Sequence, residues 1–159
     1  MFTASQYTGT REEQYELVAK QLEALISDEP NVVANLANAS ALLNQFLDQV
    51  NWVGFYLDDG KELVLGPFQG LPACIRIPFG KGVCGTAYAQ RKTIRVEDVN
   101  QFEGHIACDA NSQSEIVVPI IVNDEVKGVL DIDSPITHRF DEVDQKGLEL
   151  FVQTLCKYL

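Results

Sequence analysis

The chain has 159 residues, 46% of them hydrophobic and 22% charged, which is the usual size and composition of one globular domain. Its 23 acidic and 12 basic residues give a formal net charge of -11, which opposes binding to nucleic acid or to anionic lipid. The sequence holds no apolar run of transmembrane length and begins with no export signal, so we expect a cytoplasmic protein that does not bind membranes.

Two amphipathic helices are predicted first along the chain. Thr10 and Glu13 fit a capping box, and apolar residues follow at helical spacing as far as Ile26. The segment 28–30, Asp-Glu-Pro, ends this helix and starts the next, whose apolar face is predicted over residues 33–47. Both apolar faces need a partner, so we expect these helices to pack early against the rest of the fold.

The pattern then changes from helix to strand. Residues 52–57 are rich in aromatic and β-branched side chains and end at Asp58-Asp59-Gly60, which predicts a strand followed by a hairpin turn. Further strands are predicted at 62–65, 74–78 and 92–96, with a short helix at 83–90 after the Gly-rich turn at 80–82.

The last part of the chain predicts a long loop, a hairpin and a helix. Residues 97–114 have weak periodicity, and connections of this length are often functional. Strands at 115–122 and 126–133 are predicted to pair around Asn123-Asp124, and Asp141 is predicted to cap a final helix. Hairpin connections with helices at both chain ends indicate one α+β domain over residues 1–159, with a central antiparallel sheet flanked by those helices.

Four cysteines are the first candidates for chemistry. In a reducing compartment cysteines seldom form structural disulfides, which leaves packing, metal binding and redox chemistry. Cys156 falls in the apolar pattern of the final helix, so we expect it in the core. Cys74, Cys84 and Cys108 lie in or beside turns and loops, and a helix start such as that of Cys84 favours a thiolate. Redox or nucleophilic use is favoured for these three, with packing and metal binding as alternatives.

A zinc site is the main competing interpretation of the same cysteines. No two of them have the close CxxC spacing of a zinc knuckle, and the candidate fourth ligand, His105, is expected on the surface. We therefore predict no metal site.

Carboxylates interrupt two of the apolar strands. Asp131 and Asp133 alternate onto one face of their strand, and Glu115 lies at the start of the neighbouring one. Either this face is solvated, or the acids form a pocket for an ammonium group in which one acid stays protonated. Trp52 and Tyr56 also share one face of their strand, and they either pack in the core or line a ligand pocket.

The chain resembles the free methionine-R-sulfoxide reductases, a catalytic branch of the GAF-domain superfamily. The resemblance covers nearly the whole chain and rests on Cys74 and on the segments NWVGFY (51–56), GPFQG (66–70), GKGVCG (80–85), GHIACD (104–109), SEIVVP (114–119) and GVLDIDSP (128–135). GAF domains that only bind a ligand are not expected to hold all three loop cysteines.

This resemblance implies an enzyme that reduces the R epimer of methionine sulfoxide as the free amino acid. It implies a GAF-type homodimer that needs no cofactor and whose thiols are renewed by thioredoxin. By the same resemblance Cys108 is the nucleophile, and Cys84 or Cys74 is the thiol that resolves it. The alternative function is a GAF domain that senses a small ligand without chemistry.

The resemblance also implies a substrate pocket, formed by Trp52, Tyr56, Glu115, Asp131 and Asp133. We expect Cys108 to attack the sulfoxide sulfur while Glu115 or Asp133 supplies the proton that its oxygen needs. The acids would pair with the α-ammonium group, and backbone N–H groups of Ile106, Ala107 and Cys108 would hold the substrate carboxylate.

Overall fold

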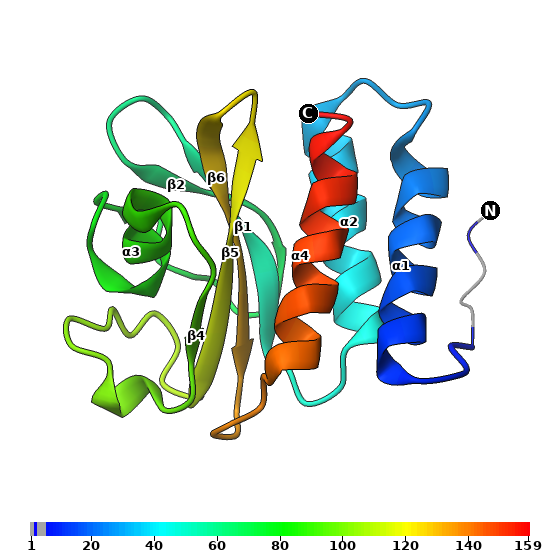
Figure 1. Cartoon of the computed structure of the whole chain (residues 1–159). Coiled ribbons are helices and arrows are strands. Elements are labelled where there is room, and N and C mark those ends of the chain that lie inside the picture. Colours follow the sequence, from blue (N-terminus) through cyan, green and yellow to red (C-terminus); the bar gives the residue numbers. More distant parts are fainter. Residues whose placement is uncertain (1, 3–5) are drawn as a thin grey trace.

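The structure, a computed structural model, describes residues 2 and 6–159. Six strands form one sheet in the order β3-β2-β1-β6-β5-β4, and each pair of neighbours is antiparallel (Figure 1). The strands are β1 (Trp52–Asp58), β2 (Leu63–Gln69), β3 (Arg76–Ile77), β4 (Ile94–Val96), β5 (Ser114–Val122) and β6 (Glu125–Ser134). The helices are α1 (Arg11–Ile26), α2 (Val32–Phe46), α3 (Gly82–Gln90) and α4 (Glu142–Cys156), with a 3-10 turn η1 (Val99–Gln101). The predicted α+β class is confirmed.

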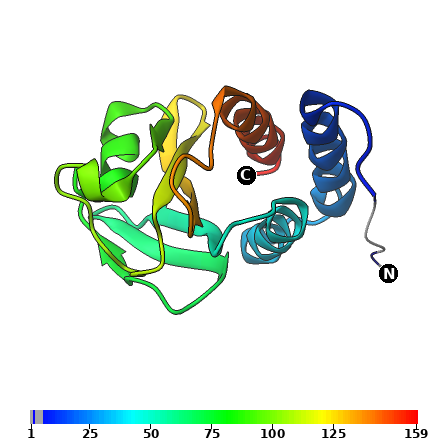
Figure 2. The ribbon, with the colours of Figure 1, turned by 90° about the horizontal axis from the view of Figure 1, so that it is seen from below.

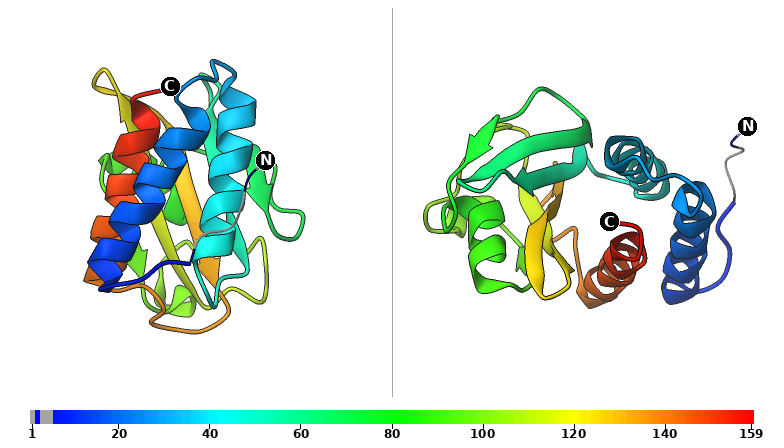
Figure 3. Two further views of the ribbon diagram at one scale, coloured as in Figure 1. Left: turned by 90° about the vertical axis from the view of Figure 1, so that its right-hand side faces the viewer. Right: turned by 90° about the horizontal axis from the view of Figure 1, so that it is seen from above.

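The two faces of the sheet have different covers. α2 packs on β1 and β2 and α4 packs on β5, while α1 lies outside them against α4 and α2 (Figures 2 and 3). α3 and the long loop before β5 cover the opposite face. Within residues 2 and 6–159, no helix combines the length and the apolar character needed to cross a membrane.

Side chains cap the first and last helices at the predicted residues. Thr10 accepts a hydrogen bond from the backbone N–H of Glu13, and Asp141 accepts one from that of Asp144. In both helices the reciprocal bond completes a capping box, which satisfies N–H groups that the helix itself leaves unpaired. Asn31 caps α2, so that helix begins just after the predicted restart at Pro30.

β2 is longer than the predicted strand at 62–65, because it continues to Gln69. Its pairing with β1 shifts register between Gly54 and Tyr56, where two residues of β2, Gly66 and Pro67, lie opposite the single residue Phe55. Proline cannot donate to a ladder and is tolerated at such an irregularity. The predicted strand is therefore too short, because it stops before this proline.

Strand alternation divides the buried residues into two cores. Val53 and Phe55 face the core under α1, α2 and α4, whereas Trp52 and Tyr56 face the core under α3. The predicted shared face of Trp52 and Tyr56 is confirmed. Cys156 lies half-buried at the edge of the first core instead of inside it.

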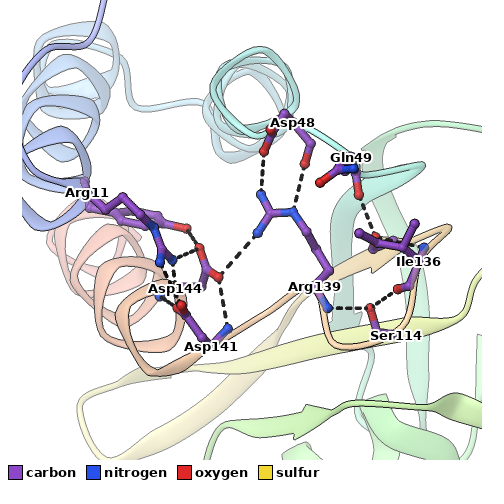
Figure 4. A network of polar contacts seen from close by, with 10 residues as sticks. Arg11, Asp48, Gln49, Ser114, Ile136, Arg139, Asp141 and Asp144 are labelled. Carbon is purple, nitrogen blue, oxygen red and sulfur yellow. Dashed lines mark hydrogen bonds and ion pairs between the residues drawn. The ribbon is translucent and has the colours of Figure 1, made fainter.

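A network of ion pairs, here called the Asp144 cluster, joins helices α1 and α4 to the loop between β6 and α4 (Figure 4). It consists of Arg11, Tyr15, Arg139, Asp141 and Asp144. The Asp144 side chain is 4% exposed and lies 3.1 Å from Arg11 Nη2 and 3.3 Å from Arg139 Nη1. The Tyr15 hydroxyl donates to Asp144 Oδ1 at 2.6 Å. This buried carboxylate therefore has cations and hydrogen-bond donors around it.

Candidate active site

A disulfide joins Cys74 to Cys108 across 34 residues, with their Cα atoms 5.5 Å apart. Cys74 precedes β3, and Cys108 lies in the long loop before β5. Both residues are partly exposed, so the disulfide is within reach of the surface. Of the two thiols predicted as partners for Cys108, the structure brings Cys74 to it and leaves Cys84 free.

A cavity lies beside this disulfide, between the sheet, α3 and the long loop. Its interior volume is about 30 Å³. Eight of the predicted site residues line it: Trp52, Tyr56, Cys84, Ile106, Cys108, Glu115, Asp131 and Asp133. Ala107 is exposed and is not among the lining residues, and Cys74 contributes through its bond to Cys108.

Glu115, Asp131 and Asp133, here called the acidic pocket, form one wall of the cavity. Glu115 pairs with Asp133 across β5 and β6, and Val117 pairs with Asp131, so alternation places all three carboxylates on the α3 side. Glu115 is 6% exposed and Asp131 5%. Burial raises the pKa of all three groups well above its ordinary value, and repulsion between the carboxylates raises each pKa further. This wall favours bound protons or a cation.

His105 is the one basic residue within ion-pair distance of the acidic pocket, among the residues that the structure describes. Its Nε2 lies 3.6 Å from Glu115 Oε1, and its side chain is only 15% exposed. The expectation of a surface histidine is therefore wrong, because the loop folds back over the sheet. Burial lowers the pKa of His105, so the neutral imidazole that predominates at neutral pH leaves the acids uncompensated.

Cys84 lies in the first turn of α3, buried against the acidic pocket. Burial first, and then the charges of Asp131, Glu115 and Asp133, raise the pKa of its thiol well above the ordinary value. The expectation of a thiolate at this helix start is therefore wrong. The helix dipole favours the thiolate by at most about 2 kcal/mol, and burial beside several carboxylates disfavours it by more.

Aromatic residues of β1 line the cavity beside the acids, since Trp52 pairs with Asp133 across β1 and β6. Trp52 stacks on Phe68 and Tyr56 at centroid distances of 5.1 and 5.9 Å, and its Nε1–H donates to the Leu71 carbonyl at 3.1 Å. A Cβ at Gly54 would lie 2.2 Å from that of Phe68, so this stack needs a glycine there. The Tyr56 hydroxyl donates to the Cys74 carbonyl at 2.8 Å. Tyr56 therefore also supports the disulfide segment.

Other residues hold the Cys108 loop in place. Asn51 Nδ2 donates to Asp109 Oδ2 at 3.0 Å and to Ser112 Oγ at 3.2 Å, and Ser112 also bonds to Asp133. At the other end of the loop, a Cβ on Gly82 would lie 3.0 Å from Ile106. The sequence reasoning missed the supporting roles of Asn51 and Ser112. Only the folded path of the loop brings them beside the acidic pocket, so no local pattern could have indicated them.

The donor atoms decide which metal sites are possible. The predicted alternative, zinc held by the three loop cysteines and His105, does not exist in this state because Cys74 and Cys108 are bonded to each other. A different set, made by Cys84, Glu115 and Asp131, has its donor atoms within 4.8 Å of one another. The cavity thus combines a disulfide, aromatic side chains and buried acids, and His105 is the basic side chain that the described residues bring into ion-pair range of these acids.

Comparison with known proteins agrees with this geometry. The family model described as GAF domain matches residues 27–155. Protein YtsP of Bacillus subtilis is 61% identical, with 100% of this chain and 99% of that protein covered. The free methionine-R-sulfoxide reductase of Escherichia coli is 53% identical over 88% of this chain and 85% of its own length. The crystal structure of the Neisseria meningitidis free methionine-R-sulfoxide reductase with its substrate superposes with a TM-score of 0.94, at 44% identity, covering 99% of this chain and 95% of that one. The chain belongs to the GAF-domain family, in the branch that contains the free methionine-R-sulfoxide reductases.

Proposed function

We propose that this protein reduces free L-methionine-(R)-S-oxide to L-methionine, with residues 1–159 acting as one catalytic domain. The observation that carries the proposal is the Cys74–Cys108 disulfide beside a cavity walled by Trp52 and buried carboxylates. A dithiol that forms such a bond can supply the two electrons that a sulfoxide needs.

In the first step the Cys108 thiolate attacks the sulfoxide sulfur. The sulfoxide oxygen must gain a proton to leave, and burial and repulsion between the carboxylates raise the pKa of Glu115 and Asp133, which favours their protonated, donating forms. Oxygen passes to Cys108 as a sulfenic acid, and methionine departs with its sulfur reduced by two electrons.

In the second step the Cys74 thiol attacks the sulfenic sulfur of Cys108. Water leaves, and the product is the disulfide present in the structure. Cys84 is the less suitable resolving thiol, because its raised pKa leaves little thiolate and its side chain is hydrogen-bonded to Asp131.

The acidic pocket explains selectivity for a free amino acid. An α-ammonium group would neutralise the buried acids, and methionine inside a polypeptide lacks that group. Trp52 would contact the S-methyl group, and backbone N–H groups of the Ile106–Cys108 segment would hold the carboxylate.

Thioredoxin is the proposed reductant of the disulfide, in the cytoplasm, and a homodimer is the proposed assembly. Both bonded cysteines are partly exposed, as a mixed disulfide with a second protein requires. Leu71 and Ile75, which flank Cys74, are 57% and 66% exposed and offer that protein apolar contacts. No cofactor enters this cycle.

The test is an epimer-resolved assay with chelator-treated protein and dithiothreitol. We expect methionine from the free R epimer, and none from the S epimer or from peptide-bound methionine sulfoxide. Cys108→Ser should abolish the first turnover, whereas Cys74→Ser should keep it and lose thioredoxin-coupled cycling. Cys156→Ser is the matched control and should behave as wild type. No methionine above the blank from any substrate would contradict the proposal and favour a ligand sensor.

A further inference from the structure

We propose that Cys84, Glu115 and Asp131 form a binding site for a divalent cation of the zinc class in the disulfide-bonded state. Each residue offers one donor atom, and the sulfur and two carboxylate oxygens all lie within 4.8 Å of one another. All three residues are buried, and they come from three different elements, α3, β5 and β6. The fold therefore gathers these donors at one point.

An independent observation at the same point is the carboxylate of Asp131. Its Oδ1 atom is buried and has no hydrogen-bond partner among the residues that the structure describes. Asp131 lines the cavity, so this buried oxygen lies next to it. A buried acceptor without a partner disfavours the folded state, and more so if it is charged. A cation bound at this oxygen would remove this effect.

The interior of the cavity, about 30 Å³, has room for one metal ion and a water ligand in this state. Zinc bonds of about 2.0–2.3 Å in a tetrahedron need donor atoms about 3.3–3.7 Å apart, so side-chain shifts of about 1 Å would complete the site. His105 Nε2 lies 3.6 Å from Glu115 Oε1 but outside the set of donors that are within 4.8 Å of one another, so it would have to move closer to become a fourth ligand.

The donor types select the class of ion. One sulfur, two carboxylate oxygens and a nearby imidazole suit Zn²⁺ or Co²⁺, whereas Mg²⁺ and Ca²⁺ prefer oxygen ligands alone. Binding would exchange the Cys84 proton for a metal–sulfur bond, with no change of oxidation state. The ion would also balance the negative charge of Glu115 and Asp131.

A consequence for activity rests on the proposed function. The α-ammonium group of the substrate and the ion would use the same carboxylates, so the ion should act in the reduced protein as an inhibitor that competes with the substrate. A chelator should reverse this inhibition. Zinc would then occupy the acidic pocket in both the disulfide-bonded and the reduced protein.

The binding test uses the full chain in its disulfide form, stripped of metal and titrated with Co²⁺. Cys84 and Cys156 are the free thiols in this state, so wild type and Cys156→Ser should bind about one Co²⁺ per chain with a sulfur-to-cobalt charge-transfer band. Cys84→Ser should lose the band. Asp131→Asn should weaken binding more than about tenfold, since even a supporting contact is worth about 10- to 100-fold in metal affinity. Zn²⁺ should displace Co²⁺, and Mg²⁺ should not.

Failure of this inference is separable from failure of the proposed function. Wild type without a charge-transfer band, or a band that persists in Cys84→Ser, overturns the metal site even if the protein reduces free methionine sulfoxide. Stoichiometric binding that depends on Cys84 and Asp131 supports the site even if the protein has no reductase activity. Zinc inhibition of the reduced enzyme that excess substrate does not relieve overturns the shared use of the carboxylates.

Discussion

The Asp144 cluster and the acidic pocket both bury carboxylates in this fold, but they treat the charge in opposite ways. Asp144 has Arg11 and Arg139 within 3.1 and 3.3 Å, and Tyr15 donates a hydrogen bond to it. The acidic pocket brings three carboxylates together with only neutral His105 in ion-pair range, among the residues described. One cluster is complete within the chain, and the other is complete only with a proton or a cation.

This difference indicates that one cluster serves the stability of the fold and the other serves binding. Removing one partner from a buried, paired charge leaves the other uncompensated, so the Asp144 cluster should contribute to the folded state. Buried like charges without a counter-charge disfavour the folded state, so the acidic pocket should be retained for what it binds. Exchanging charged for neutral side chains in each cluster tests this division.

The largest expected effect is on activity, from Glu115→Gln in the acidic pocket. The amide cannot donate a catalytic proton, so kcat/KM for free methionine-R-sulfoxide should fall by about 10²- to 10⁴-fold. The free energy of unfolding should not fall, because one of three repelling acids is removed. Steady-state kinetics and urea unfolding on the same preparation measure both quantities. Equal losses of activity and stability would erase the contrast between the clusters.

Asp144→Ala should give the opposite profile, and the second-largest effect. Arg139 and Tyr15 would lose a buried partner and α4 would lose part of its capping box, so we expect destabilisation of about 3 kcal/mol. Activity per folded molecule should stay within about twofold of wild type, since the cluster does not contact the cavity. A stability change below about 0.5 kcal/mol would show that the buried pairs do not support the fold.

The two clusters should also respond to pH with opposite signs. In the acidic pocket the folded pKa values exceed the unfolded values near 4, so the folded state binds more protons above that pH. Its contribution to stability should therefore fall as pH rises through this window. Arg11 lowers the pKa of Asp141, so the stability that Asp141 contributes is present above about pH 4 and lost as the pH falls.

Urea unfolding of chelator-treated, disulfide-bonded protein measures this difference. Between about pH 5 and pH 8, wild type should lose more than about 1 kcal/mol of stability, and Asp131→Asn should lose less. Asp124→Asn is the matched control, because its side chain is 98% exposed and its φ of 67° is one that asparagine tolerates. A wild-type profile that is flat from pH 5 to 8 would contradict buried, proton-binding acids.

The contrast between the clusters also shows how far sequence reasoning reaches. Trp52, Tyr56, Asp131 and Asp133 could be assigned to shared faces, because the period of two along a strand is set by backbone geometry. The capping box at Thr10 and the cap at Asp141 could be identified because the groups that they bond lie three residues away. Structural features that depend on a few neighbouring residues, such as strand alternation and helix caps, can be predicted from one sequence.

Contacts made by the long loop were out of reach for the same reason. Cys74 and Cys108 meet across 34 residues, and the choice of Cys74 over Cys84 depends on how residues 97–114 fold back. That path also buries His105, which local polarity had placed on the surface. The pKa of Cys84 was misjudged because the helix start is a local feature, whereas the acids over it come from β5 and β6.

The smallest expected effect comes from Arg11→Gln, which divides the Asp144 cluster itself. Arg11 is 49% exposed and its pair with Asp141 is largely solvated, so its loss should cost less than about 1 kcal/mol. Arg139 is 11% exposed and would still neutralise Asp144, so most of the stabilisation should remain. Near pH 3 the stability of Arg11→Gln should approach that of wild type. Arg11 stabilises only the ionised carboxylate of Asp141, and this advantage of wild type is lost as the pH falls. A loss in Arg11→Gln as large as that in Asp144→Ala would mean that the exposed arginine, and not burial of the pair with Arg139, supplies the neutralising charge.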